Sequence, residues 1–131
     1  MSTILLDTHV FIWLVEDNLN LPNSVKERIV ATDNIFVSIA SFWEIGIKLQ
    51  RQKVFLNCDF DQIEAIFLAT DLQLLSISIE DTIQQSSLPF YLTGHRDPFD
   101  RMIISQAMNR SWPVVSKDQA FDAYPVERIW V

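Results

Sequence analysis

The sequence predicts an α/β fold, in which a central, mainly parallel sheet carries helices on both faces and residues 1–131 form a single domain. Three observations predict it. Short apolar runs of strand length alternate with longer amphipathic runs of helical length. Hydrophobic residues make up 49% of the chain and charged residues 21%, which is typical of a compact globular protein. With 131 residues and no visible repeat or linker, the chain is long enough for one core and too short for two.

The elements nearest the amino terminus begin this alternation. Residues 3–6, "TILL", form an apolar run short enough for a buried strand. The run "HVFIWLV", residues 9–15, has helical length. Residues 23–31, "NSVKERIVA", predict a second helix, and Asn23 or Ser24 is its expected N-cap because short polar side chains satisfy free backbone N–H groups.

The middle of the chain predicts two strands and three helices. Residues 34–38, "NIFVS", are β-branched or aromatic in the manner of a strand, and they pass directly into a helix over residues 39–52. Residues 59–70 place their apolar side chains on one side of a helix. Residues 72–78 predict a strand, and residues 79–88 a short helix that the following proline ends.

The last third of the chain predicts a helix over residues 98–110, a strand over 112–116, a short helical turn over 119–124 and a strand over 126–131. Helices that separate successive strands imply right-handed crossover connections. The strands should therefore run parallel, with helices covering both faces of the sheet.

Four carboxylates fall where parallel sheets place their sites, beyond the carboxyl ends of the strands. Asp7 directly follows the first strand, and Asp118 follows the fourth. Glu44 lies in the helix after the second strand, and Asp100 at the start of the helix that leads into the fourth. We expect these four side chains to gather at one end of the sheet.

Each of three acids also has an ordinary structural interpretation, which the sequence leaves open. Asp7 and Asp118 each precede a helical segment and can serve as its N-cap. Glu44 stands four residues before Lys48, the favourable order for an ion pair on an exposed helix face.

Asp100 is harder to explain as a structural residue. With Pro98 at the first helical position, Asp97 is the expected N-cap and Asp100 the third helical residue. On a helical wheel, Asp100 falls in the middle of the apolar face formed by Ile103, Ile104, Ala107 and Met108. The opposite side is predicted to carry Arg101, Ser105, Gln106 and Asn109. Because burying an unpaired carboxylate costs several kcal/mol, this position favours a bound divalent cation shared with other acids.

Composition excludes several other classes of site. Two glycines leave no phosphate-binding glycine loop, and Cys58, the single cysteine, has no partner for a disulfide or a zinc site. His9 and His95 lack metal-ligand spacing, so we interpret His9 as a helix residue beside the site. No leader and no apolar run near the length of a membrane span is visible, and we expect a cytoplasmic protein.

The net charge of −7 argues against a nucleic-acid-binding protein, whose binding surface is usually basic. Acids that converge on a metal ion remove part of this objection, because the ion neutralises them in the working protein.

Five segments together resemble the PIN-domain ribonucleases, and among these the VapC-type toxins of bacterial toxin–antitoxin pairs. They are "LLDTHVFIW", "VSIASFWEIGIKLQ", "HRDPFDRMIISQA", "VVSKDQAF" and "YPVERIWV", in the order and spacing of the family. The resemblance runs from residue 4 to the carboxyl terminus. It implies a PIN-like three-layer α/β/α fold and a metal-dependent endoribonuclease that hydrolyses RNA phosphodiester bonds.

By this resemblance, Asp7, Glu44, Asp100 and Asp118 match the four acidic positions that hold Mg²⁺ or Mn²⁺. Oxygen ligands suit such hard cations, which activate a water for in-line attack on phosphorus and stabilise the leaving oxygen. Asp7 and Asp100 are the expected primary ligands, and Glu44 and Asp118 would complete the pocket.

The resemblance also implies supporting residues and partners. Thr8 matches the small hydroxyl residue beside the first acid, and Ser116 stands where family members often have Thr. Asp97 belongs to the "HRDPFDR" form of its motif, with its role as cap or ligand left open. A homodimer and a small antitoxin, whose C-terminal segment occupies the active-site groove, are the implied protein partners.

Three alternatives remain at this point. A haloacid-dehalogenase-like phosphatase needs a second acid two residues after its first aspartate, where this chain has His9. A phospho-receiver domain would match Asp7, Ser116 and Lys117 in part, but the run "LLSIS" offers no phospho-accepting aspartate. A non-catalytic dimeric binding module is the third, and it survives only if metal binding and cleavage both fail. Four aromatic residues are expected in the core, with an exposed patch for a partner or a dimer as the alternative: Phe11, Trp13, Phe42 and Trp43.

Overall fold

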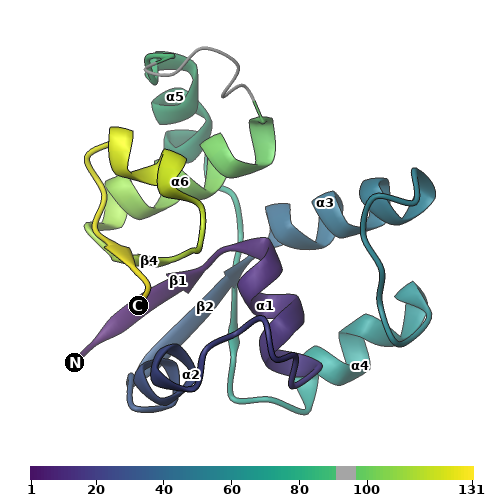
Figure 1. Cartoon of the computed structure of the whole chain (residues 1–131). Coiled ribbons are helices and arrows are strands. Elements are labelled where there is room, and N and C mark those ends of the chain that lie inside the picture. Colours follow the sequence, from purple (N-terminus) through teal and green to yellow (C-terminus); the bar gives the residue numbers. More distant parts are fainter. Residues whose placement is uncertain (91–96) are drawn as a thin grey trace.

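A computed structural model of the chain describes residues 1–90 and 97–131. These residues form a five-stranded sheet with helices around it (Figure 1). The strand order is β3-β2-β1-β4-β5, and every recorded pairing is parallel. The strands are β1 (Thr3–Leu6), β2 (Asn34–Ser38), β3 (Gln73–Leu75), β4 (Val114–Val115) and β5 (Arg128–Ile129). The predicted parallel sheet is confirmed.

Helices cover both faces of this sheet (Figure 1). Those of the first group are α1 (Thr8–Val15), α2 (Asn23–Val30), α3 (Ile39–Gln50) and α4 (Ile63–Leu68), the last preceded by the 3₁₀ turn η1 (Phe60–Gln62). Those of the second group are α5 (Ile79–Ser87), α6 (Pro98–Arg110) and the 3₁₀ segment η2 (Gln119–Ala123).

Two apolar cores lie between these layers, one on each face. Successive side chains of a strand point to opposite faces, so Ile4 and Leu6 join the core beneath the first group while Leu5 joins the core beneath the second. The first core contains Phe11, and the second contains Ile103 and other α6 residues. The structure therefore has the three-layer α/β/α arrangement that the resemblance implied.

Register brings the ends of three strands to one edge. Leu6 of β1 pairs with Val37 of β2 and with Val115 of β4. The residues that follow, Asp7, Ser38 and Ser116, consequently lie side by side at the carboxyl edge of the sheet. This edge is where the sequence predicted the acids to gather.

Several predicted boundaries are wrong. The N-cap of α2 is Pro22, which forms no side-chain cap, rather than Asn23 or Ser24. The strand predicted over residues 72–78 ends at Leu75, because Ser78 instead caps α5 in a reciprocal pair with Asp81. The fourth and fifth strands are likewise only two residues long, and the helix predicted over residues 59–70 is a 3₁₀ turn followed by α4.

Helix α6 is not amphipathic in the predicted way. Arg101, Ser105 and Gln106, which the wheel placed on the solvent side, are all buried. Arg101 is accommodated because its guanidinium donates hydrogen bonds to the carbonyl oxygens of Leu88 and Pro89. The helix therefore runs through the interior of the second layer.

The four aromatic residues of the first and third helices do not form a common surface. Phe11 is fully buried, Phe42 and Trp13 pack partly buried against the same core, and Trp43 alone among the four is largely exposed.

Across residues 1–90 and 97–131, none of the helices has the length and apolar character needed to traverse a bilayer.

Candidate metal centre

All four predicted acids line one cavity at the carboxyl edge of the sheet. Its volume is about 620 Å³. The four reach it from separate elements: Asp7 from the end of β1, Glu44 from α3, Asp100 from α6, and Asp118 from the loop before η2. His9, Lys48 and Lys117 are among the other lining residues.

Asp7 is held by hydrogen bonds to both of its carboxylate oxygens. Oδ1 accepts from the Thr8 backbone N–H at 2.8 Å, and Oδ2 accepts from the Ser116 hydroxyl at 2.7 Å. Burial raises the pKa of Asp7 to about 6, in spite of these two hydrogen bonds, which lower it; the charge of Glu44 adds to the rise. Asp7 is thus both the cap of α1 and an oriented carboxylate of the cavity.

Glu44 is 2% exposed and fixed by its neighbours on two sides. The Thr8 hydroxyl donates to Oε1 at 2.6 Å, and this hydroxyl also lies 2.9 Å from Ser41 Oγ. The other oxygen, Oε2, forms an ion pair with Lys48 one helical turn later. The ion pair that the sequence offered as an alternative exists, but on a buried carboxylate inside the cavity.

Asp97 and Asp100 occupy the first turn of α6. Asp97 Oδ1 accepts from the backbone N–H groups of Phe99 at 2.8 Å and Asp100 at 3.2 Å, so the predicted N-cap is confirmed. Asp97 Oδ2 lies 3.6 Å from Lys48 Nζ. Burial, reinforced by the charges of Asp7, Asp97, Glu44 and Asp118, raises the pKa of Asp100 to about 9.

Asp118 combines a structural role with a place in the cavity wall. Its Oδ1 accepts from the Ala120 N–H at 2.9 Å, which caps η2 as the structural interpretation expected. Its own backbone N–H donates to Ser116 Oγ at 3.0 Å. Ser116 therefore connects Asp7 with the segment that carries Asp118.

The arrangement fits a divalent cation of the Mg²⁺ class. Among the described residues, Glu44, Asp97 and Asp100 each offer a carboxylate oxygen, and these three oxygens lie within 4.8 Å of one another. Asp7 and Asp118 line the same cavity from the segments that follow the neighbouring strands β1 and β4. Hard oxygen donors of this kind suit Mg²⁺ or Mn²⁺, and so dense a group of carboxylates requires positive charge nearby.

Sequence reasoning underestimated some residues of the site. The sequence left the role of Asp97 open, yet Asp97 belongs to the group of three carboxylates whose oxygens lie within 4.8 Å of one another. Ser41, beside the cavity, was not predicted, because a single serine in a helix carries no recognisable signal. Lys117 lines the cavity, although the sequence singled it out only as part of the phospho-receiver alternative. His9 lies on α1 in the cavity wall, as interpreted, and its ring contacts that of Trp13 at a centroid distance of 5.8 Å. His95 lies outside the described residues.

Comparison with known proteins matches this chain to a family model and to a curated relative. The family model for the PIN domain matches residues 4–127. Ribonuclease VapC22 from Mycobacterium tuberculosis is 25% identical over 124 residues, which cover 91% of this chain and 89% of that protein.

Solved structures with the same fold cover nearly the whole chain. The DNA-bound VapBC complex from Salmonella typhimurium includes a chain with a TM-score of 0.72 and 20% identity, covering 98% of both chains. The VapBC2 complex from Rickettsia felis, bound to a promoter DNA fragment, gives a TM-score of 0.69 at 14% identity with the same coverage.

Proposed function

This chain belongs to the PIN domain family, and on that premise we propose that it is a metal-dependent endoribonuclease, a VapC-type toxin that hydrolyses RNA phosphodiester bonds. The observation that carries the proposal is the convergence of Asp7, Glu44, Asp100 and Asp118 on one cavity. The name of a relative, ribonuclease VapC22, points to the same activity.

The cation would be Mg²⁺ or Mn²⁺, held by Asp7 and Asp100 with Glu44 and Asp118 directly or through water. A carboxylate oxygen of Asp97 lies in the same group as those of Glu44 and Asp100, which makes Asp97 a further candidate ligand. When bound, such an ion supplies a water of lowered pKa as nucleophile and positive charge for the leaving oxygen.

The protein's own residues prepare this site. Thr8 and Ser116 each donate a hydroxyl hydrogen bond, which aims Glu44 and Asp7 respectively before any ligand arrives. Lys48 forms ion pairs with Glu44 and Asp97. Its ammonium group therefore already lies beside the acidic cavity that the RNA backbone would approach. Such fixed orientation lowers the reorganisation needed during the reaction.

The test is RNA cleavage by purified protein freed of any antitoxin. Cleavage should require added Mg²⁺ or Mn²⁺ and stop in excess EDTA. Asp100→Asn should nearly abolish it, whereas Asp33→Asn is the matched control, because Asp33 bonds only to Ser2 in its recorded contacts and does not line the cavity. Full cleavage in EDTA would rule out the metal mechanism.

The rival enzyme class has less support. A haloacid-dehalogenase-like phosphatase requires an acid where His9 stands. Hydrolysis of a phosphomonoester such as p-nitrophenyl phosphate, without RNA cleavage, would favour that class. Failure of both activities and of metal binding would favour a non-catalytic dimeric binding module.

Protein partners complete the proposal. We assign the chain a cytoplasmic location, a homodimeric state and a small antitoxin that masks the cavity. Co-expression with the neighbouring small open reading frame should yield a stable, inactive complex, and light scattering should give its stoichiometry. A soluble, active monomer that captures no product of that reading frame would argue against this assignment.

A further inference from the structure

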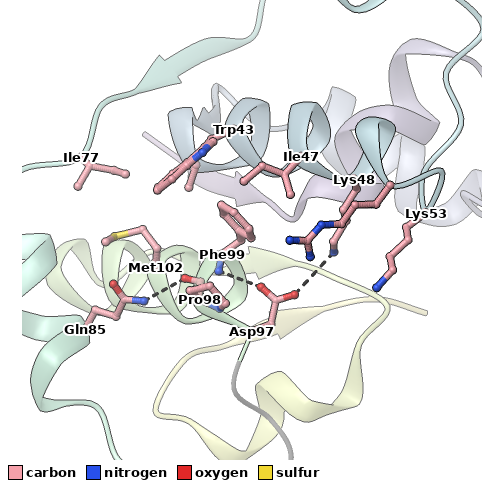
Figure 2. A pocket seen from close by; sticks show the side chains of 12 residues that line it. Trp43, Ile47, Lys48, Lys53, Ile77, Gln85, Asp97, Pro98, Phe99 and Met102 are labelled. Carbon is pink, nitrogen blue, oxygen red and sulfur yellow. Dashed lines mark hydrogen bonds and ion pairs between the residues drawn. The ribbon is translucent and has the colours of Figure 1, made fainter.

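A second hollow lies next to the acidic cavity, between α3, α5 and α6 (Figure 2). Its volume is about 600 Å³, and we call it the α3–α6 groove. Lys48 lines both hollows, and Asp97 and Phe99 belong to the groove wall. The groove therefore starts where the acidic cavity ends, at the first turn of α6.

The groove and the cavity have opposite charge. The cavity is lined by four carboxylates and two lysines, Lys48 and Lys117. Among the described residues that line the groove, Asp97 is the single acid, against three cations: Lys48, Arg51 and Lys53. Figure 2 shows Lys48 and Lys53 directed to the side of the groove where Asp97 lies. In a chain of net charge −7, a basic hollow next to an acidic one needs an explanation.

Most other cations are already engaged in the part of the chain that the structure describes. Lys26 pairs with Asp17, Arg110 with Asp81, and Arg128 with Asp122. Arg101 is buried against carbonyl oxygens. No ion pair is recorded there for Arg51 or Lys53, and both are exposed.

The end of α3 fixes where these two cations lie. Gln52 has a positive φ of 57°, and the Lys53 N–H donates to the Lys48 carbonyl at 2.8 Å. This left-handed turn at Gln52 closes the helix, and the residues before and after it, Arg51 and Lys53, both line the groove. Cations at a helix C-terminus also complement its dipole, which is the purely structural alternative.

An exposed aromatic side chain stands in the same groove. Trp43 is 64% exposed, and its ring meets that of Phe99 edge to face at a centroid distance of 5.3 Å. The contact holds the indole in place while leaving much of it open. Such an aromatic surface beside cations is typical of single-stranded nucleic-acid binding, where bases stack and the backbone follows positive charge.

We propose that the α3–α6 groove holds the RNA strand next to the bond that is cut, with phosphates on Arg51 and Lys53 and a base stacked on Trp43. The inference rests on the proposed ribonuclease function and extends it to substrate binding. A polyanion that approaches a protein of net negative charge needs a local basic path, and this groove is joined to the acidic cavity through Lys48.

The test measures RNA binding apart from cleavage. Fluorescence anisotropy of a short labelled single-stranded RNA is recorded in EDTA, at several salt concentrations, for wild type and two double variants. The first variant is Arg51→Gln with Lys53→Gln. The second, Lys26→Gln with Arg28→Gln, removes the same charge from α2, where neither residue lines the cavity or the groove.

The groove variant should bind RNA at least tenfold more weakly than wild type, and the control variant within about twofold. Each phosphate contact on a single strand contributes about 0.7 to the salt dependence of log K, so the groove variant should lose about 1.4 from that slope. Trp43→Ala should weaken binding about tenfold with an unchanged circular dichroism spectrum.

Two results would overturn the inference. One is equal RNA binding by the groove and control variants, which would leave Arg51 and Lys53 as helix-end cations. The other is loss of antitoxin binding by the groove variant while RNA binding is retained, which would assign the groove to the protein partner. The proposed function is tested separately, by RNA cleavage in Mg²⁺. If wild type does not cleave RNA in that assay, the proposed function is refuted rather than the role of the groove.

Discussion

Asp81 carries a buried ion pair whose removal should destabilise the protein measurably. Its side chain has no exposure, and Oδ1 and Oδ2 accept from Arg110 at 2.7 and 3.1 Å. Asn109 and the Ser78 backbone N–H donate two further hydrogen bonds. This network joins the start of α5 to the end of α6, the helix that presents Asp100 to the cavity.

Removing one partner of a buried ion pair costs about 3–5 kcal/mol. Because the Arg110 side chain is 23% exposed and can regain water, we expect Asp81→Asn to lower the free energy of unfolding by about 3 kcal/mol. That corresponds to a fall of about 10 °C in Tm for a domain of this size. Urea unfolding followed by circular dichroism measures it.

The matched control is Asp122→Asn, which removes the same kind of pair at the surface. Asp122 is 56% exposed and accepts from Arg128 at 2.9 and 3.0 Å. Solvent screens an exposed pair, which therefore contributes little to stability, so the control should unfold nearly as wild type does. Equal losses in the two variants would refute the reasoning from burial.

The pH dependence gives a second check on Asp81. Burial raises the pKa of Asp81, but hydrogen bonds from Arg110, Ser78 and Asn109 outweigh it and hold the pKa well below its ordinary value. The stabilisation is therefore fully present above the unfolded-state pKa of about 3.9 and is lost as pH falls below it. Between pH 7 and pH 3, the difference between wild type and Asp81→Asn should narrow by about 1 kcal/mol.

Three further predictions concern the metal centre. Saturating Mg²⁺ should raise the free energy of unfolding, by about 2.7 kcal/mol at a hundredfold excess over Kd, and an identical response by Asp100→Asn would show that Asp100 is not a ligand. Without metal, the raised pKa of Asp100 means that stability falls as pH rises from about 4 toward 9; the advantage of Asp100→Asn over wild type should thus be larger at pH 8 than at pH 5, by thermal unfolding. Thr8→Val should cost about 1–3 kcal/mol in denaturant unfolding, because Glu44 loses a buried hydrogen-bond donor; an unchanged midpoint would show that Thr8 contributes no stability there.

Strand and helix order was predictable because the periodicity of apolar residues is itself set by burial against a sheet. The exact ends of strands and helices were not predictable, because side-chain capping of a helix competes with hydrogen bonding between strands. The stretch of residues 72–78 has the composition of a strand throughout, yet Ser78 forms a capping pair with Asp81 and the strand stops early. A cap of this kind is decided by three-dimensional geometry rather than by periodicity.

The acids were predictable for a different reason, since parallel strands bring their carboxyl ends to one edge. What the wheel of α6 missed is that a charged side chain can be buried when backbone carbonyl oxygens accept from it. Arg101 is such a case: its acceptors, Leu88 and Pro89, follow the end of α5 and are not its neighbours on the helix. Pattern analysis of a single helix does not contain that information.

Asp97 and Asp100 provide the last prediction, because the structure divides the tasks of Asp97 between its two oxygens. Oδ1 caps α6 through the N–H groups of Phe99 and Asp100, while Oδ2 faces Lys48. Asp97→Ser keeps an acceptor for the cap and removes the charge, so it should retain substantial cleavage. Asp97→Ala should lose about 1 kcal/mol of stability as the cap disappears.

Asp100→Asn keeps the shape of the side chain and removes a charged oxygen from the cavity, so it should nearly abolish cleavage while the circular dichroism spectrum stays unchanged. Cleavage rates and spectra of the three variants, measured side by side, separate capping from ligation. If Asp97→Ser is as inactive as Asp100→Asn and equally well folded, then Oδ2 of Asp97 serves the metal. The proximity of Glu44, Asp97 and Asp100 would in that case describe the ligand set itself, and capping would be the lesser of the two roles of Asp97.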